Sequence, residues 1–352
     1  MNKLLLWCNL LAGTCFANMT WAQPNAVLAD LDYQGQPLTT NVSKPYRITA
    51  GLAGRHLSVW ASHGLYYEAK RNSWQWQRPP LFGTNEDLFT PTIVLPYLIP
   101  MLEKSGAIVL SPRERDLQTE EVIVDNDAKN SHLYKEKNGL HHWRNTSSSG
   151  FANPRASYVD GENPFKMGTA RMARTVKQED KRSEIAFIPQ IKNKGKKAVY
   201  VCYQTLPEST DNAQYTVYHK GQATTFSVNQ RMGGGTWVYL GTFDFGEGCS
   251  KNNCVVQNNV CSKDGVVTAD AVRFGGGMGN IRRGESVSGM PRALEGARYA
   301  AQWYGAPQEV YSSKEGRDDY GDDVNARALI SNWWAGGSVF LPTKSEIGRA
   351  HV

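Results

Sequence analysis

The chain has 352 residues, of which 40% are hydrophobic and 20% are charged, and its formal net charge is +6. This composition supports a buried core in each of two domains of about 100–200 residues, and it excludes wholesale disorder. The charge is mild for the length, and the densest basic run, KNKGKK at 192–197, precedes an apolar strand, so it is typical of a solvated turn and does not indicate a nucleic-acid-binding surface.

Residues 1–22 have the pattern of a cleaved signal peptide. An early Lys3 precedes an apolar stretch at 4–16, and small residues stand at Thr20 and Ala22. The apolar stretch is shorter than the about 20 residues that a membrane-spanning helix needs, and no later segment is apolar enough to span a bilayer. We therefore expect cleavage after Ala22 and an exported protein that is periplasmic, displayed on the cell surface or secreted.

A lipoprotein acylated at Cys15 is the alternative for the N-terminus. Thr14, which stands directly before that cysteine, fits a lipoprotein signal poorly. Cleavage after Ala22 is the favoured interpretation.

Residues 23–50 form a polar lead-in segment, and residues 51–127 predict the first part of an α/β domain. A buried strand is expected at 56–62, a long apolar helix at 88–102 and a second buried strand at 107–111. Strand, helix and strand in succession indicate parallel pairing and hence an α/β sheet.

The long helix carries signals for its start and for a break. The run Asn85-Glu86-Asp87 places a cap and two acids at its N-terminus. Pro96 and Pro100 predict that the helix is kinked or broken.

Residues 128–155 are a polar linker, and residues 156–290 predict a β-sandwich. Short alternating strands, spaced by roughly 10 residues with glycine and asparagine between them, are typical of that fold. They are expected at 198–205, 213–220, 224–229, 236–245 and 265–274. Helical patterns return at 293–304 and 323–334, so residues 291–346 are interpreted as a return to the α/β part, which makes the β-sandwich an inserted domain.

Four cysteines follow the signal peptide, namely Cys202, Cys249, Cys254 and Cys261. An even number in an oxidising compartment predicts one or two disulfides, and the turn-like Ser-Lys-Asn-Asn between Cys249 and Cys254 places these two across from each other. A zinc site made of cysteines alone is the alternative, although the spacing lacks a C-x2-C pair.

A candidate metal site lies at the end of the first strand. His63 follows that strand and Glu86 opens the next helix, and sites in open α/β sheets form outside the carboxyl ends of the strands. An imidazole and a carboxylate brought together there can bind Zn²⁺ and leave a position for water. The alternative for His63 is an ordinary hydrogen-bonded structural residue.

The stretch 51–116 resembles the first half of a zinc-dependent N-acetylmuramoyl-L-alanine amidase. The resemblance rests on Ser62-His63-Gly64, Asn85-Glu86-Asp87-Leu88, Leu102-Glu103-Lys104-Ser105-Gly106-Ala107 and Arg113-Glu114-Arg115-Asp116. It implies that His63 and Glu86 are zinc ligands. Arg115 and Asp116 fall at a further family motif whose form departs here, so they receive no role.

That family also has another histidine ligand and a late catalytic glutamate, and neither can be placed in this sequence. His132, His141, His142 and His219 lie in loop or β surroundings that do not match the family. The catalytic residues therefore stay unassigned, and the general base is expected beyond the C-terminus.

A second resemblance covers about residues 158–280 and is to the golvesin/xanthan-lyase carbohydrate-binding-like domain. It rests on Tyr215-Thr216-Val217-Tyr218-His219, Phe226-Ser227-Val228-Asn229-Gln230, Gly233-Gly234-Gly235-Thr236-Trp237, Leu240-Gly241-Thr242-Phe243 and Ala269-Asp270-Ala271-Val272-Arg273-Phe274. It implies a β-sandwich that binds sugar. Trp74, Trp76 and Trp237 are candidates for stacking on sugar rings, with aromatic packing as the alternative for each.

The last six residues, 347–352, match the translation of a common sequencing adapter, so the natural protein is expected to continue beyond about Glu346. The sequence thus predicts a fragment of an exported, zinc-dependent amidase-like cell-wall hydrolase that acts on peptidoglycan and carries a carbohydrate-binding-like domain. Whether this chain is an enzyme stays open, and as given it is expected to be inactive. The alternatives are a non-catalytic envelope protein that binds another polysaccharide and an accessory region of a xanthan lyase. The oligomeric state stays open.

Overall fold

The computed structural model describes residues 36–128 and 133–335. The expected signal peptide and the adapter-like tail lie outside these residues. Within them the chain is predominantly β, and the strands fall into two larger sheets and three smaller ones. All described residues belong to one compact unit.

Two antiparallel sheets build the β-sandwich. The six-stranded sheet has the order β1-β13-β12-β15-β10-β7, and the four-stranded sheet has the order β14-β11-β17-β6. The first consists of β1 (Thr39–Asn41), β13 (Gln222–Val228), β12 (Ala213–His219), β15 (Cys254–Asn258), β10 (Glu184–Phe187) and β7 (Tyr134–Lys137). The second consists of β14 (Val238–Phe245), β11 (Gly195–Val201), β17 (Ala271–Phe274) and β6 (Val122–Asp125).

One hydrophobic core lies between these sheets. Val201 of β11 and Val272 of β17 share it with Val217 of β12 and Val255 of β15, and none of these side chains is exposed. Alternating apolar residues of each strand face inward, as the strand period of two requires. The expected β-sandwich is therefore present.

A third antiparallel sheet has the order β16-β9-β8 and consists of β16 (Val266–Ala269), β9 (Gly168–Arg174) and β8 (Arg144–Gly150). Ala173 and Val267 lie opposite each other in β9 and β16 and both belong to the sandwich core. Since side chains alternate along a strand, Met172 and Arg174 of β9 lie on the opposite face of this sheet.

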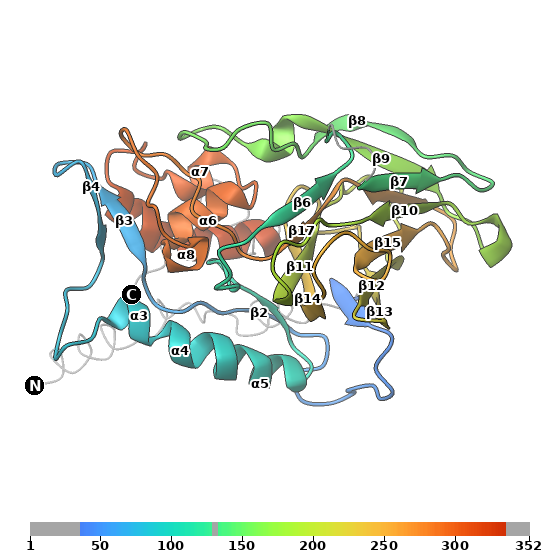
Figure 1. Cartoon of the computed structure of the whole chain (residues 1–352), viewed down its shortest axis with the longest axis horizontal. Helices are drawn as coiled ribbons and strands as arrows, with labels where there is room; N and C mark the ends of the chain where they lie inside the picture. Colours follow the sequence, from blue (N-terminus) through green and yellow to red (C-terminus); the bar gives the residue numbers. More distant parts are fainter. Residues whose placement is uncertain (1–35, 129–132, 336–352) are drawn as a thin grey trace, which may run out of the picture. The chain divides into compact units, whose positions relative to one another are not determined.

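The expected strand–helix–strand unit is formed by short elements. β2 (His56–Ser58) and β5 (Ile108–Leu110) pair in parallel, as predicted. The apolar run between them is helical in pieces: α3 (Glu86–Phe89), α4 (Pro91–Ile93), the π-helical turn η1 (Val94–Leu98) and α5 (Ile99–Lys104) (Figure 1). Pro96 and Pro100 lack the N–H that a regular helix needs, which accounts for the predicted break.

Two strand pairs cross the domain boundaries that the sequence suggests. β1, from the lead-in segment, pairs with β13. β6, from the segment assigned to the α/β part, pairs with β17. The boundaries themselves stay predictions, but the lead-in and α/β segments each contribute a strand to the sheets of the β-sandwich.

Helices follow the β region, as expected, at α6 (Ala297–Trp303), α7 (Gln308–Tyr311) and α8 (Asp319–Ala335). Their buried side chains share a second core with residues of the β region. Trp303 of α6 lies 6.0 Å from Phe151 and 6.4 Å from Trp237 between ring centroids. The helices therefore pack directly on the β region.

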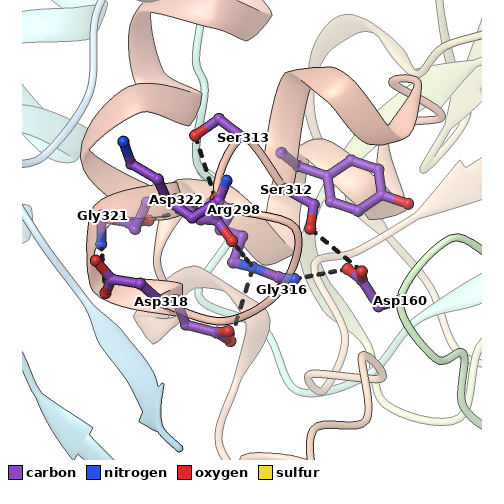
Figure 2. A network of polar contacts seen from close by, with 12 residues as sticks. Asp160, Arg298, Ser312, Ser313, Gly316, Asp318, Gly321 and Asp322 are labelled. Carbon is purple, nitrogen blue, oxygen red and sulfur yellow. Dashed lines mark hydrogen bonds and ion pairs between the residues drawn. The ribbon is translucent and has the colours of Figure 1, made fainter.

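A buried ionic network anchors the same helices (Figure 2). The guanidinium of Arg298 on α6 is not exposed, and its Nη2 lies 2.6 Å from Asp160 Oδ1. Its Nε lies 3.4 Å from Asp322 Oδ2 on α8, and Ser312 Oγ donates to Asp160 Oδ2 at 3.2 Å. Arg298 thus links two helices to the loop that carries Asp160.

The four cysteines of the described part of the chain are all free. Cys202, Cys254 and Cys261 are buried, and Cys249 is exposed. The turn expected after Cys249 is present, since Asn253 N donates to Ser250 O at 3.0 Å. Cys254 Sγ, however, contacts the carbonyl of Lys251 at 3.1 Å, so the structure does not form the expected Cys249–Cys254 disulfide.

Candidate functional site

His63 and Glu86 lie side by side, although 23 positions separate them in the sequence. His63 follows β2, and Glu86 is the first residue of α3, whose N-cap is Asn85. His63 Nδ1 lies 3.4 Å from Glu86 Oε1 and also 3.4 Å from Oδ1 of the neighbouring Asp87. Ser62 Oγ bridges the pair, at 2.7 Å from His63 Nδ1 and 2.8 Å from Glu86 Oε1. The expected proximity is confirmed, whereas metal binding by this pair stays a prediction.

Burial and two neighbouring arginines favour the neutral form of His63. Arg78 Nη2 lies 3.0 Å from His63 Nε2, and because a guanidinium can only donate, Nε2 accepts and the ring proton is on Nδ1. Burial lowers the pKa of His63, and the positive charges of Arg327 and Arg78 lower it further. The imidazole is therefore neutral at neutral pH.

Arg113 holds the backbone of the His63 loop in place. This buried side chain donates to the carbonyls of Ala61 and His63. It also donates to Glu295 O at 3.0 Å and to Ala293 O at 2.9 Å. Burial lowers the pKa of Arg113 to about 10. Arg113 therefore links residues 61–63, which follow β2, to residues 293–295, which precede α6.

Gly64 is required at the same contact. A Cβ at this position would meet Arg113 Nη2 and the backbone of Glu295 at 2.7 Å each. The His-Gly pair of the sequence therefore has a packing reason that is independent of any metal.

The motif Arg113-Glu114-Arg115-Asp116 joins the α/β segment to the β region. Glu114 pairs with Arg273 of β17 at 2.7 Å. Arg115 pairs with Glu103 at 2.8 Å and lies 3.8 Å over the ring of Tyr239. Asp116 Oδ2 accepts a hydrogen bond from Ala198 N at 2.7 Å. Sequence reasoning gave Arg115 and Asp116 no role. Glu103 is 12 positions from Arg115, but the partners of Glu114 and Asp116 are 159 and 82 positions away, so the structural role of this motif depends mainly on distant contacts.

The described residues do not complete a metal centre. Among them, no group of three or more histidine, cysteine, aspartate or glutamate side chains could hold a metal ion. His63 and Glu86 are two candidate ligands, and a catalytic zinc takes three from the protein. His132 lies outside the described residues, and His219 on β12 instead contacts Thr224 Oγ1 at 3.0 Å.

Trp237 is enclosed by other side chains. It is 5% exposed, and its ring centroid lies 4.8 Å from Phe151 and 5.4 Å from Phe165. The side chain of Arg273 lies 5.4 Å from the same ring. No face of Trp237 is open to a sugar, and its position corresponds to the packing alternative.

Trp74 and Trp76 lie on β4 (Ser73–Trp76), which forms a hairpin with β3 (Leu65–Glu68). Trp74 is half-buried, with its ring 4.8 Å from Tyr299 and 5.9 Å from Tyr67. Trp76 is half-buried as well. Both stay candidates for contact with sugar.

A polar groove with a volume of about 400 Å³ lies on the third sheet. It is a feature that sequence reasoning missed, because its residues come from separate strands and loops. Its lining consists of His141, Arg144, Met172, Arg174, Thr175, Glu208, Asp264, Gly265 and Val266.

Residues 145–276 match the family model of the Golvesin C-terminal domain. A xanthan lyase from Bacillus sp. (strain GL1) is 33% identical over 90 residues, which are 26% of this chain and 10% of that protein. The chain therefore spans about a tenth of the length of the curated relative that it matches. Residues 145–276 are therefore similar to the Golvesin C-terminal domain, and part of the chain is similar to part of a xanthan lyase.

Solved structures resemble the chain weakly. The Paenibacillus xanthan lyase structure is 22% identical, with a TM-score of 0.34, and the match covers 45% of this chain and 13% of that one. A xylan-binding domain from CBM 22 is 9% identical, with a TM-score of 0.22, and the match covers 43% of this chain and 90% of that domain. Within the described residues, no helix is long and apolar enough to cross a membrane.

Proposed function

We propose that this chain is an exported polysaccharide-binding protein and that its golvesin-like domain contacts the glycan. The observation that carries the proposal is the match of residues 145–276 to the Golvesin C-terminal domain, together with the similarity of part of this chain to a xanthan lyase. The name of that relative indicates action on a polysaccharide. A domain of this kind brings a protein to its glycan.

The surface of the domain supports the proposal. The groove on the third sheet combines guanidinium donors with carboxylate acceptors, and sugar hydroxyls both donate and accept hydrogen bonds. Its apolar floor, from Met172 and Val266, suits the C–H faces of a sugar ring. Small-molecule sites typically combine such an apolar surface with a few placed polar groups.

The test is retention of the mature chain, residues 23–352, on insoluble polysaccharides. Peptidoglycan sacculi, xylan and cellulose serve as solid phases, and soluble glycans are tested by retarded migration in native gels. We expect retention on at least one glycan and release by the matching soluble oligosaccharide. Heat-unfolded protein is the control for adsorption. No retention on any glycan beyond that control would refute the proposal.

A second candidate function is that of a zinc-dependent amidase acting on peptidoglycan, and the 3.4 Å approach of His63 Nδ1 to Glu86 Oε1 favours it. Zinc, when bound, would polarise a carbonyl and lower the pKa of bound water. His63 and Glu86 are two candidate ligands, and such a site takes three from the protein, so hydrolysis would require a further ligand.

The metal is tested by titrating the mature chain with Zn²⁺ and measuring heat and bound zinc. If His63 and Glu86 are ligands, His63→Ala and Glu86→Gln each weaken zinc binding at least tenfold. His219→Ala, which alters a histidine in β12, is the matched control and leaves binding unchanged. If the unaltered chain and the three variants bind zinc equally, His63 and Glu86 are not zinc ligands.

A further inference from the structure

The groove of the golvesin-like domain presents two arginines on one face of the third sheet. Arg144 of β8 lies opposite Met172 of β9, and Arg174, two residues further along β9, lies opposite Val266 of β16. Residues that are paired across strands, or two apart on one strand, share a face. Arg144 and Arg174 are therefore diagonal neighbours above a floor that includes Met172 and Val266.

Neither guanidinium is neutralised by the protein. Arg144 and Arg174 are exposed, and within the described residues neither side chain has an ion pair or hydrogen bond. Arg171, on the other face of β9, differs: its Nε lies 2.7 Å from Glu136 Oε1 and its Nη2 lies 2.9 Å from Glu136 Oε2. On β9, Glu136 therefore neutralises Arg171, whereas Arg174 of the same strand and Arg144 of β8 stay available in the groove.

The carboxylates of the groove do not compensate for these charges. Asp264 Oδ1 lies 3.4 Å from Lys177 Nζ, and that pair is largely exposed. Glu208 is exposed at the groove without a side-chain partner among the described residues. Two free guanidinium groups against one free carboxylate leave the groove positive, which favours an anionic ligand over a neutral one.

We propose that this groove binds a carboxylate-bearing sugar of an acidic polysaccharide, such as a uronic acid unit. The inference rests on the proposed function and specifies its substrate class. Arg144 and Arg174 bind the sugar carboxylate, because guanidinium and carboxylate match in planar, two-bond geometry. Glu208 accepts hydrogen bonds from ring hydroxyls, and Met172 contacts the C–H face of the sugar.

The experiment measures binding of the mature chain to polygalacturonate, to alginate and to dextran, a neutral glycan, by calorimetry at two salt concentrations. We expect both uronates to bind at least tenfold more tightly than dextran and to weaken as salt rises. Arg144→Gln and Arg174→Gln each weaken uronate binding about tenfold, because each removes a charge-assisted hydrogen bond. Arg282→Gln, which alters an exposed arginine outside the groove, is the matched control and retains binding.

The outcomes separate this inference from the function on which it rests. Failure to bind any glycan, acidic or neutral, refutes the proposed function itself. Equal binding of dextran and uronates, unaffected by the two substitutions, refutes only the acidic-sugar inference. Inorganic polyphosphate is the last comparison: binding as tight as that of uronates would show a nonspecific site for polyanions and would likewise overturn the inference. Circular dichroism of each variant excludes misfolding as the cause of lost binding.

Discussion

Glu114 and Arg273 form an ion pair 2.7 Å long in which neither side chain is exposed to solvent. Glu114 follows β5, and Arg273 lies on β17, where its guanidinium stacks 3.9 Å over the ring of Tyr200. Burial acts to raise the pKa of Glu114, but the charge of Arg273 and the hydroxyl of Tyr200 lower it below its ordinary value. The pair links the segment after β5 to β17, which is an inner strand of the four-stranded sheet.

Glu114→Gln is expected to destabilise the protein by about 3–5 kcal/mol, since it leaves the charge of Arg273 buried without its main partner. The free energy of unfolding, measured with urea, checks this. Lys220→Ala is the control, because it breaks an exposed pair with Asp244 and should cost less than about 1 kcal/mol. Equal losses in the two variants would mean that the buried pair is not a stabilising link.

The excised segment 156–290 is expected not to unfold cooperatively. It lacks β6, Glu114 and the helix that carries Trp303, so the edge of β17 and the ring of Trp237 would face water. The segment 36–335 retains these partners and should show one thermal transition by near-ultraviolet circular dichroism. A sharp transition of the short segment would show that the β-sandwich folds independently, as its sequence pattern alone suggests.

Stability should fall between about pH 4.5 and pH 7 through Glu295. Burial raises the pKa of this carboxyl to about 7 in the folded state, from an ordinary 4.5. Over that interval the unfolded chain has released the proton while the folded one retains it, so rising pH favours unfolding. The change corresponds to roughly 3 kcal/mol and is complete above the folded pKa.

Glu295→Gln should therefore reduce the slope of unfolding free energy against pH in this interval. Urea unfolding at pH 5, 6 and 7.5 measures the slope. Glu285→Gln, which alters an exposed carboxyl in the preceding loop, is the control and should leave it unchanged. An unaltered slope in the Glu295 variant would place the titrating group elsewhere.

Trp237→Ala should destabilise the protein by about 3–5 kcal/mol, because it empties space inside an aromatic cluster. Trp237→Phe keeps most of that packing and should retain both fold and glycan binding. Trp76→Ala, on the half-buried hairpin, should cost less stability. A folded Trp237→Phe variant that no longer binds glycan would restore Trp237 as a sugar contact.

Local patterns in the sequence predicted many of the elements. The strands at 213–220 and 236–245 correspond to β12 and β14 within two residues at each end, because alternation of apolar residues reports directly on a half-buried strand. The prolines at 96 and 100 predicted the break in the long helix, since a missing N–H acts locally. The approach of Glu86 to His63 also followed from the order of strand and helix.

The remaining features depend on contacts between distant residues. The sequence around Arg113 does not indicate its partners. They are the carbonyls of Ala61, 52 positions earlier, and of Ala293, 180 positions later. The shared burial of Trp237 and Trp303 likewise joins two segments that sequence patterns assign to different domains.

The sequence by itself determined the signal-peptide pattern, the β character of the central region and the pairing of His63 with Glu86, because each follows from periodicity or from neighbouring elements. Only the tertiary structure decided that Trp237 is a core residue and that Arg144 and Arg174 share a groove. Burial and net local charge depend on which side chains fold together, and Arg171 is neutralised only because Glu136, 35 positions earlier, lies beside it. Periodicity in the sequence predicts which face of a strand a residue lies on. Which side chain it contacts on that face depends on how the distant segments of the chain fold together.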